Sequence, residues 1–287
     1  MTLEPPFHRV GIVGLGLIGG SIALAVRAAW PDVTLVGVDR PEALAKADAR
    51  GLLDRAGPGV DVLAGVDLVV LCAPVRQNLS ILAQVEAAVP PTSVITDAGS
   101  TKLQISEAAG RLSAAGRFVG GHPLAGAAVA GLDHARADLF RGQPWILTPG
   151  GATDPRAVER LHAWVSALGA VPTVMSADEH DRLLAFVSHL PQLVASALMS
   201  VVGDAVGAEG LAFAGRGLVD TTRLASSPPE IWRDIAASNA ERIAPALDAM
   251  IALLHELRAD LASGVRLDDV FAEAARWRDQ LVPRATL

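Results

Sequence analysis

The sequence predicts an α/β protein in two parts, a parallel sheet covered by helices and then an all-α domain. Its 287 residues are too many for one small core. Short apolar runs alternate with helical segments through the first half, whereas after about Ser176 the strand signals stop and helix-forming residues continue to the end. We therefore place a first domain at residues 1–173 and a helical domain at residues 174–287.

The predicted strands are nearly uninterrupted apolar runs, as expected for a sheet that is buried on both faces. They are Arg9–Val13, Thr34–Asp39, Leu68–Ala73, Ser93–Thr96, Arg117–Gly120, Pro144–Thr148 and Val171–Met175. Segments of helical period lie between several of them, such as Gln77–Val89 and Thr101–Ala115. The regular alternation of strand and helix indicates parallel pairing.

Three long helical segments are expected in the second domain. They are Asp178–Ala205, Pro229–Leu261 and Leu267–Leu281, the second of them broken or bent near Pro245.

Two uncharged stretches resemble membrane spans in composition, but we expect neither to enter a membrane. Val10–Val26 contains five glycines. Leu183–Gly203 carries Ser188, His189 and Gln192 near its centre, and such groups are costly in lipid. A helix that is apolar on every face is also typical of a protein core or a subunit interface, so we expect a homodimer that buries Leu183–Gly203.

Composition excludes several classes of protein. Hydrophobic residues make up 51% of the chain, which excludes intrinsic disorder. The 24 Lys and Arg against 31 Asp and Glu give a net charge of −7, with no basic surplus for nucleic acid. The single cysteine, Cys72, excludes an internal disulfide and a thiolate zinc site, and we expect it to be a small buried hydrophobe. No cluster argues for a metal, and a cytoplasmic location fits best.

The strongest motif is Gly14-Leu-Gly16-Leu-Ile-Gly19, which follows a predicted strand and begins an apolar helix. Gly14 allows the tight turn, Gly16 lets a pyrophosphate approach the backbone, and Gly19 lets helix and strand pack closely. The motif indicates a Rossmann-type dinucleotide-binding domain; the alternative is a glycine-rich turn without a ligand. Cofactor contacts are expected from this turn, including Leu17 and Ile18, and from Ala73 and Pro74 at the end of another strand.

Asp39 lies 20 residues after Gly19, at the end of the second predicted strand. A carboxylate in this place accepts hydrogen bonds from the ribose hydroxyls and repels a 2′-phosphate, so NAD is expected in preference to NADP. The adjacent Arg40 weakens that preference.

Two further motifs follow predicted strands at the same edge of the sheet. Asp97-Ala-Gly-Ser100-Thr-Lys102 either begins a helix as an ordinary N-cap or presents a hydroxyl and an ammonium to the cofactor crevice. Gly120-Gly-His122-Pro-Leu-Ala-Gly126 holds a histidine between glycines and a proline, which suits a general base near neutral pH. A structural loop histidine is the alternative for His122.

The second domain contributes two candidate motifs. Ser188-His189-Leu-Pro191-Gln192 lies in the apolar helix, where His189 is either a core residue or a functional group beside a proline-induced bend. Asp220-Thr-Thr-Arg223 either forms a solvated loop or presents a guanidinium to a substrate carboxylate. The remaining histidines are expected to be surface or structural residues: His8, His134, His162, His180 and His255.

Taken in order, these motifs resemble the prephenate/arogenate dehydrogenase family of tyrosine biosynthesis. The matching segments are Gly14–Gly19, Asp39, Asp97–Lys102, Gly121–Gly126, Ser188–Pro191, Asp220–Arg223 and Ile231-Trp232-x-Asp-Ile followed by Asn239. The resemblance implies a Rossmann-type domain, a dimerising helical domain and an NAD-linked oxidative decarboxylation of a cyclohexadiene. It implies that His122 accepts the proton of the ring hydroxyl and that Ser100 orients that hydroxyl and the nicotinamide.

The same resemblance implies substrate contacts from Arg223, His189, Lys102 and Asp220. One segment departs from the family pattern, because Ala127–Ala130 lacks the acidic and hydroxyl side chains often found there. Prephenate is the expected substrate and arogenate the closest alternative. A β-hydroxyacid dehydrogenase or imine reductase shares the glycine motif but usually needs a lysine that Asp178–Ala205 lacks. A non-catalytic NAD-binding protein would not need His122, Ser100 and Arg223 together.

Overall fold

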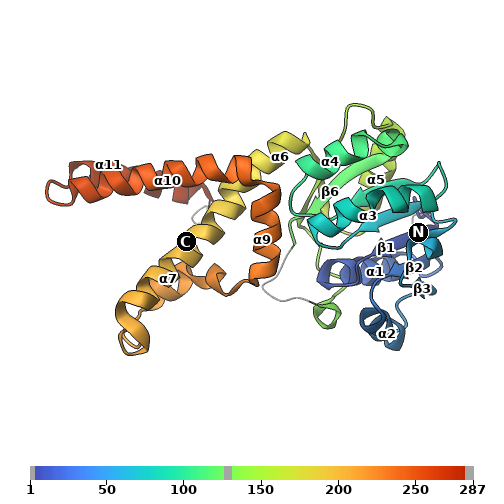
Figure 1. Ribbon diagram of the computed structural model, residues 1–287, viewed down its shortest axis with the longest axis horizontal. Coiled ribbons are helices and arrows are strands. Elements are labelled where there is room, and N and C mark those ends of the chain that lie inside the picture. The colour runs from blue at the N-terminus through green and yellow to red at the C-terminus, as the bar shows by residue number, and fades with distance from the viewer. Residues whose placement is uncertain (1–3, 126–130, 282–287) are drawn as a thin grey trace, which may run out of the picture. The chain divides into compact units, whose positions relative to one another are not determined.

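The computed structural model describes residues 4–125 and 131–281. It contains an eight-stranded sheet with the strand order β3-β2-β1-β4-β5-β6-β7-β8. Several of these strands are labelled among the helices that cover them in Figure 1. The strands are β1 (Arg9–Val13), β2 (Thr34–Val38), β3 (Arg55–Gly57), β4 (Leu68–Leu71), β5 (Val94–Asp97), β6 (Phe118–Pro123), β7 (Pro144–Pro149) and β8 (Val171–Val174). Neighbouring strands pair in parallel except β6 and β7, which are antiparallel.

The predicted α/β fold class is confirmed, with two corrections to the sheet. Strand β3 was not predicted, because its sequence Arg-Ala-Gly has no branched or aromatic side chain. Parallel pairing was wrong for β6 and β7. In the described residues between these strands the chain forms only the short helix η3 (Leu132–His134), and a parallel return needs a longer crossover.

The sheet is buried on both faces, because successive side chains of a strand point in opposite directions. On one face, Val10 and Ile12 of β1 belong to a core that includes residues of α1 (Leu17–Ala29) and α5 (Pro155–Ala167). On the other face, Val13 belongs to a core that includes residues of α3 (Val75–Ala88) and α4 (Leu103–Gly110). Alternation along β1 therefore explains why each strand is apolar at almost every position.

The remaining helices complete the description of the chain. They are α2 (Pro41–Ala49), α6 (Ala177–Leu184), α7 (Leu190–Leu211), α8 (Arg216–Thr221), α9 (Pro229–Ser238), α10 (Ala240–Asp260) and α11 (Val265–Leu281), with short 3₁₀ turns η1 (Val60–Leu63), η2 (Ser113–Gly116) and η5 (Arg223–Ser226). The predicted segment Pro229–Leu261 is broken at Asn239, where the chain leaves helical geometry, and not at Pro245, which lies inside α10.

A π-helical turn, η4 (Ala185–His189), joins α6 to α7. Pro191 follows it and cannot donate a backbone hydrogen bond to the preceding turn, and a wider turn accommodates that loss. By length and composition alone the helical stretch Ala177–Leu211 is able to cross a membrane, although Gly207 leaves helical geometry near its end with a φ of +61°. In the most apolar part of this stretch only 22% is buried inside the protein. Buried His180, Asp181, His189 and Gln192 lie within the stretch, as in a helix that serves a protein site.

The chain divides into two compact units. One ends at Ala240 and contains the sheet and helices α1 to α9. The other begins at Glu241 and consists of most of α10 together with α11. All the candidate site residues described below belong to the first unit.

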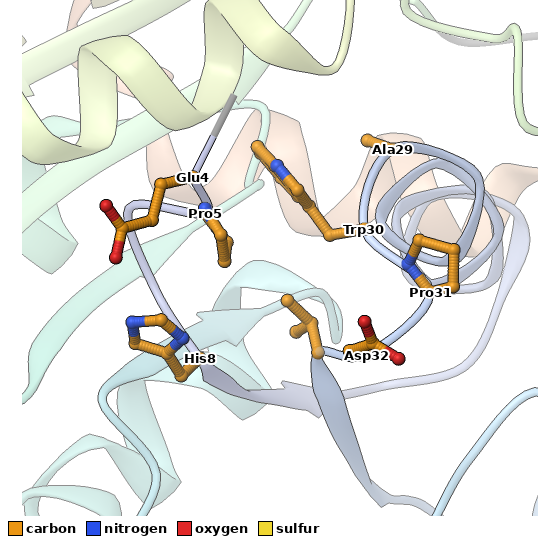
Figure 2. Close-up of a pocket in the computed structure, with 8 residues that line it drawn as sticks. Glu4, Pro5, His8, Ala29, Trp30, Pro31 and Asp32 are labelled. Carbon is orange, nitrogen blue, oxygen red and sulfur yellow. The ribbon is translucent and has the colours of Figure 1, made fainter. Parts of the chain in front are cut away.

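A pocket of about 270 Å³ opens beside the amino ends of β1 and β2. Pro5, His8, Trp30 and Pro31 are among its lining residues (Figure 2). The glycine turn, Asp39 and the Asp97–Lys102 motif follow the carboxyl ends of the strands, at the opposite edge of the sheet. Ligands of open α/β sheets bind at that carboxyl edge, so the site is built there.

Candidate active site

A glycine-rich turn connects β1 to α1. Gly14 has a φ of +96°, and a Cβ at this position would lie 2.7 Å from the backbone nitrogen of Ala73. A Cβ on Gly19 would overlap the carbonyl oxygen of Gly14, so only glycine lets α1 begin so close to β1. At Gly16, by contrast, a Cβ would meet no atom within 4 Å. The turn is therefore packed tightly on the protein side and open on the side where a ligand approaches.

The start of α1 is suited to an anion. Gly16 is the N-cap residue and provides no side-chain cap, so the N–H groups of Leu17 and Ile18 have no partner within the helix. The turn after β4 lies against the glycine turn through Ala73, and Pro74 then caps α3. These residues fit the pyrophosphate of a dinucleotide.

Asp39 directly follows strand β2, and its side chain forms a hydrogen bond with the glycine turn. Its carboxylate accepts the N–H of Leu15 at 2.6 Å and the N–H of Arg40 at 2.6 Å. Both oxygens are thereby held in place and keep further lone pairs for the hydroxyls of a ribose. The side chain of Arg40 is exposed at the start of α2.

A buried ion pair stiffens the segment between β5 and α4. Lys102 has no exposed side-chain surface, pairs with Asp97 and donates to the backbone oxygen of Gly121 at 2.8 Å. Burial lowers the pKa of Lys102, and the neighbouring Asp97 opposes that shift. Asp97 also accepts the N–H of Gly99 at 2.9 Å and of Gly121 at 3.0 Å. Lys102 therefore supports the loop from inside and does not present its ammonium to the crevice, which corrects its expected role as a substrate contact.

Ser100 lies at the middle of this loop and is partly buried. Its hydroxyl forms no hydrogen bond with any described residue, so it is available to a ligand. The next residue, Thr101, forms a hydrogen bond of 2.8 Å with the hydroxyl of Ser238 at the end of α9. The loop that carries Ser100 is thus fixed on both sides.

His122 belongs to strand β6, where it pairs in register with Ile146 of β7. This placement corrects the expectation of a loop. A Cβ on Gly121 would lie 2.5 Å from the backbone oxygen of Asp97, so the preceding glycine lets β6 pack closely at this point. Gly121 and Pro123 are buried, whereas His122 is partly exposed. A strand therefore presents the imidazole from a rigid backbone.

The imidazole of His122 begins a chain of hydrogen bonds that leads into α6. Its Nδ1 lies 2.8 Å from Nε2 of His180, and Nδ1 of His180 lies 2.7 Å from Oδ1 of Asp181. The Asp181 carboxylate also accepts the backbone N–H of Lys102 at 2.7 Å and of Leu103 at 2.9 Å. Nε2 of His122 forms no hydrogen bond with a described residue.

The surroundings keep both of these rings neutral near pH 7. Burial, together with the neighbouring charges of His180, Lys102 and His189, holds the pKa of His122 well below its ordinary value. Burial also lowers the pKa of His180, although Asp181 opposes that shift. A neutral His122 is able to accept a proton.

His189, at the end of the π-helical turn, lies on the other side of Asp181. The amide nitrogen of Asn239 lies 2.8 Å from the backbone oxygen of Asp181 and 3.2 Å from Nδ1 of His189. Because an amide nitrogen only donates, Nδ1 of His189 accepts and Nε2 carries the hydrogen. Burial lowers the pKa of His189 to about 4, so the ring is neutral. Its Nε2 is buried with no partner among the described residues, which leaves a donor for an acceptor on a ligand.

Asp220 lies in helix α8 and Arg223 begins the 3₁₀ turn η5 that follows it, and both side chains are exposed. Neither side chain forms an ion pair within the part of the chain that the structure describes, and neither joins the histidine cluster. Gln192 of α7 holds the turn beside Arg223, donating to the backbone oxygen of Leu224 at 2.7 Å and accepting from Ser227 at 3.1 Å. The guanidinium is thus on an anchored turn and unpaired.

Sequence reasoning missed two residues of the cluster, His180 and Asp181, and it named Asn239 only as part of the family pattern, without a role. His180 was expected on the surface or in a structural role, and it is instead fully buried against His122. One available signal was helical spacing, since His180 and Asp181 share a face of the helix with buried Leu184 and Ala185. His8, His134, His162 and His255 are exposed.

Two other sequence features do not enter the cluster. Cys72 directly follows β4, and burial and the nearby Asp97 raise the pKa of its thiol, so it is not an activated nucleophile. Gly126 and the segment Ala127–Ala130, which departs from the family pattern, lie outside the described residues. No group of three or more metal-ligating side chains occurs in the described ranges.

Comparison with known proteins covers both parts of the chain. Residues 22–174 match the family described as prephenate dehydrogenase, nucleotide-binding domain, and residues 176–273 match prephenate dehydrogenase, dimerization domain. A prephenate dehydrogenase of Bacillus subtilis (strain 168) is 35% identical over 278 residues, which are 94% of this chain and 75% of that protein.

Two solved structures are similar over nearly the whole length. Prephenate dehydrogenase from A. aeolicus, in complex with hydroxyphenyl propionate and NAD+, has a TM-score of 0.89 and 30% identity and covers 98% of this chain and 100% of its own. Arogenate dehydrogenase from Synechocystis has a TM-score of 0.82 and 31% identity and covers 96% of this chain and 100% of its own. The resemblance inferred from the ordered motifs is confirmed, and the chain belongs to the prephenate dehydrogenase family.

Proposed function

We propose that this protein catalyses the NAD-dependent oxidative decarboxylation of prephenate to 4-hydroxyphenylpyruvate, a step of tyrosine biosynthesis in the cytoplasm. The observation that carries the proposal is the state of His122. Its ring is neutral, and its Nε2 has no partner among the described residues, at the same edge of the sheet as the open glycine turn. A base and a dinucleotide site are the two requirements of this reaction.

NAD, when bound, accepts the hydride from the ring carbon that bears the hydroxyl. His122 accepts the hydroxyl proton as that carbon gains carbonyl character. The ring carboxylate then leaves as carbon dioxide, its electron pair completes the aromatic ring, and His122 returns the proton to the phenolic oxygen. Because aromatisation drives the reaction, the protein chiefly positions the reactants and moves one proton.

The other site residues supply donors for an anionic substrate. Nε2–H of His189 is buried and has no partner among residues 4–125 and 131–281, which favours an acceptor such as a carboxylate. Arg223 has no ion-pair partner in the described ranges and is suited to a second carboxylate, and the hydroxyl of Ser100, which bonds no residue in those ranges, is suited to the ring hydroxyl. Prephenate has two carboxylates and one hydroxyl, which match this set of donors.

Arogenate is the second candidate substrate, because the similar Synechocystis protein is an arogenate dehydrogenase. Arogenate carries an ammonium where prephenate carries a keto oxygen, and a buried ammonium needs a carboxylate partner. Among the matched motifs only Asp220, in helix α8 just before Arg223, offers a carboxylate close to Arg223 in the sequence, and its side chain is exposed. This favours prephenate.

The direct test follows NADH absorbance with prephenate and arogenate in parallel, at equal protein and NAD concentrations. We expect a higher kcat/KM for prephenate. A clear preference for arogenate would reverse the substrate assignment and point to Asp220 as the partner of the ammonium, and turnover of neither compound would refute the proposed activity.

We propose further that the protein acts as a homodimer. Large apolar side chains are exposed along α7 and the turn before it, including Val187 at 61% and Val201 at 68%. Such a face on a helix is typical of a subunit interface. The matched dimerization domain spans the same helices.

A further inference from the structure

We propose that His180 is a positioning residue that holds His122 in the tautomer whose Nε2 accepts a proton. This inference deepens the proposed function and rests on His122 as its base. It starts from the order of hydrogen bonds between three side chains, His122, His180 and Asp181, in which each partner determines the hydrogen position of the next.

Asp181 determines the first hydrogen position. Its Oδ1 faces the backbone N–H of Lys102 at 2.7 Å and its Oδ2 faces the N–H of Leu103 at 2.9 Å, so both oxygens accept. Nδ1 of His180, 2.7 Å from Oδ1, must therefore be the donor. A neutral imidazole carries one N–H, so Nε2 of His180 has a lone pair.

That lone pair determines the tautomer of His122. The two ring nitrogens lie 2.8 Å apart, and two lone pairs at this separation would repel each other. Nδ1 of His122 consequently carries the hydrogen, and its Nε2 is unprotonated. Without His180, a neutral histidine is free to adopt either tautomer, and the tautomer with hydrogen on Nε2 cannot accept a proton from a ring hydroxyl.

The support for His180 is rigid. A capping box between Ser176 and Glu179 fixes the first turn of α6, immediately before His180. His180 itself is fully buried and packs edge-on against His122, with ring centroids 5.1 Å apart. When His122 gains a proton, its Nδ1–H remains bonded to His180, and the carboxylate of Asp181 lies behind that ring.

A matched pair of amide substitutions separates this role from a merely structural one. The amide of Gln in His180→Gln reaches the position of Nε2 and is able to accept the hydrogen of His122, but it loses Asp181. The shorter amide in His180→Asn reaches the position of Nδ1 and keeps Asp181, but it does not reach His122. Both variants bury a neutral amide, so they differ mainly in which partner they retain.

The first readout is the ¹⁵N spectrum of histidine-labelled protein without substrate, with the His122 signals identified by their loss in His122→Asn. We expect a protonated Nδ1 and an unprotonated Nε2 in the wild type and in His180→Gln, and a mixture of tautomers in His180→Asn. The second readout is turnover of prephenate: kcat falls about 10-fold or more in His180→Asn and stays within about 3-fold of wild type in His180→Gln, with KM changed less than kcat.

The opposite ranking, with His180→Asn active and His180→Gln impaired, would overturn the proposal and leave His180 as an anchor for Asp181. An unchanged His122 tautomer in His180→Asn would overturn it as well. The spectrum needs no substrate, so it decides the question even if the wild type fails to oxidise prephenate, an outcome that refutes only the proposed function. Thermal midpoints and NAD affinity of both variants verify that they are folded.

Discussion

The side-chain amide of Asn239 links Asp181 to His189, because its nitrogen lies 2.8 Å from the backbone oxygen of Asp181 and 3.2 Å from Nδ1 of His189. Asp181 in turn bonds the ring that faces His122. One aspartate thus connects a histidine that accepts at Nε2 with a histidine that donates at Nε2. This complementary pair suits a substrate that offers a hydroxyl to one ring and a carboxylate to the other.

Asn239→Leu should weaken substrate binding more than turnover. Without the amide donor, Nδ1 of His189 is able to carry the hydrogen, and its Nε2 then presents a lone pair to a carboxylate. We expect KM for prephenate to rise about 10-fold while kcat changes less, as for loss of a charge-assisted hydrogen bond. The KM for NAD serves as the internal control. An unchanged KM for prephenate would remove His189 from the substrate site.

His122→Asn should reduce kcat by ~10²–10⁴, because an amide keeps a hydrogen bond but cannot accept the proton. The pH profile is a second measure. Since the pKa of His122 is held well below 6.5, kcat/KM of the wild type should be level above that pH and fall only in more acidic solution, where the ring gains a proton. That acidic limb should disappear in the variant, and its persistence would show that another group takes the proton.

Asp39 should make the enzyme prefer NAD to NADP by at least ~10-fold in kcat/KM, on the order of 1.4 kcal/mol. Asp39→Ala should reduce that preference, because it removes the charge that repels a 2′-phosphate. Asp48→Ala, which removes an exposed carboxylate from α2, is the matched control and should leave the ratio unchanged. Equal use of both cofactors by the wild type would contradict this role of Asp39.

Arg223→Ala should raise the KM for prephenate by ~10–10²-fold through loss of an ion pair with a carboxylate. Arg216→Ala removes another exposed arginine a short distance earlier in the chain and should have little effect. Equal effects of the two substitutions would mean that Arg223 contributes only to the general charge of this surface.

Sedimentation at micromolar concentration should give twice the chain mass of 29.6 kDa. A charge in the apolar face, introduced by Val187→Asp, should shift the equilibrium toward monomer because the carboxylate would be buried on association. Val171→Asp, on an equally apolar but separate position of β8 that is 53% exposed, is the control. A wild type found only at 29.6 kDa would refute the dimer.

The sequence was sufficient to predict those parts of the fold that depend on local patterns. Buried strands such as β1 and β4 are continuous apolar runs, and Gly14, Gly16 and Gly19 identify one turn by the spacing its geometry requires. The antiparallel return of β7 was not predictable in this way, because the composition of a buried strand is the same in either direction.

Site residues were predictable only where a single chemically active side chain lies within a recognisable sequence motif. His122 and His189 were singled out because their neighbours are unusual, while His180 has ordinary helical surroundings. Asn239 was named only as part of a family pattern, which gives it no role. The roles of His180 and Asn239 depend on hydrogen bonds between residues that are 58 and 50 positions apart in the sequence. Lys102 is the opposite case. Its motif suggested a contact with a ligand, and only the fold reveals that its ammonium forms a buried ion pair with Asp97.

The antiparallel pairing of β6 and β7 has an evolutionary consequence. Because β7 starts where β6 ends, and the N–H of Leu124 donates to the oxygen of Pro144 at 2.9 Å, the intervening segment leaves and re-enters the sheet at one point of the carboxyl edge. The number of residues in this segment therefore does not affect how β6 and β7 pair. Insertions and deletions between these two residues are able to accumulate during divergence while the strand pairing that holds His122 stays intact.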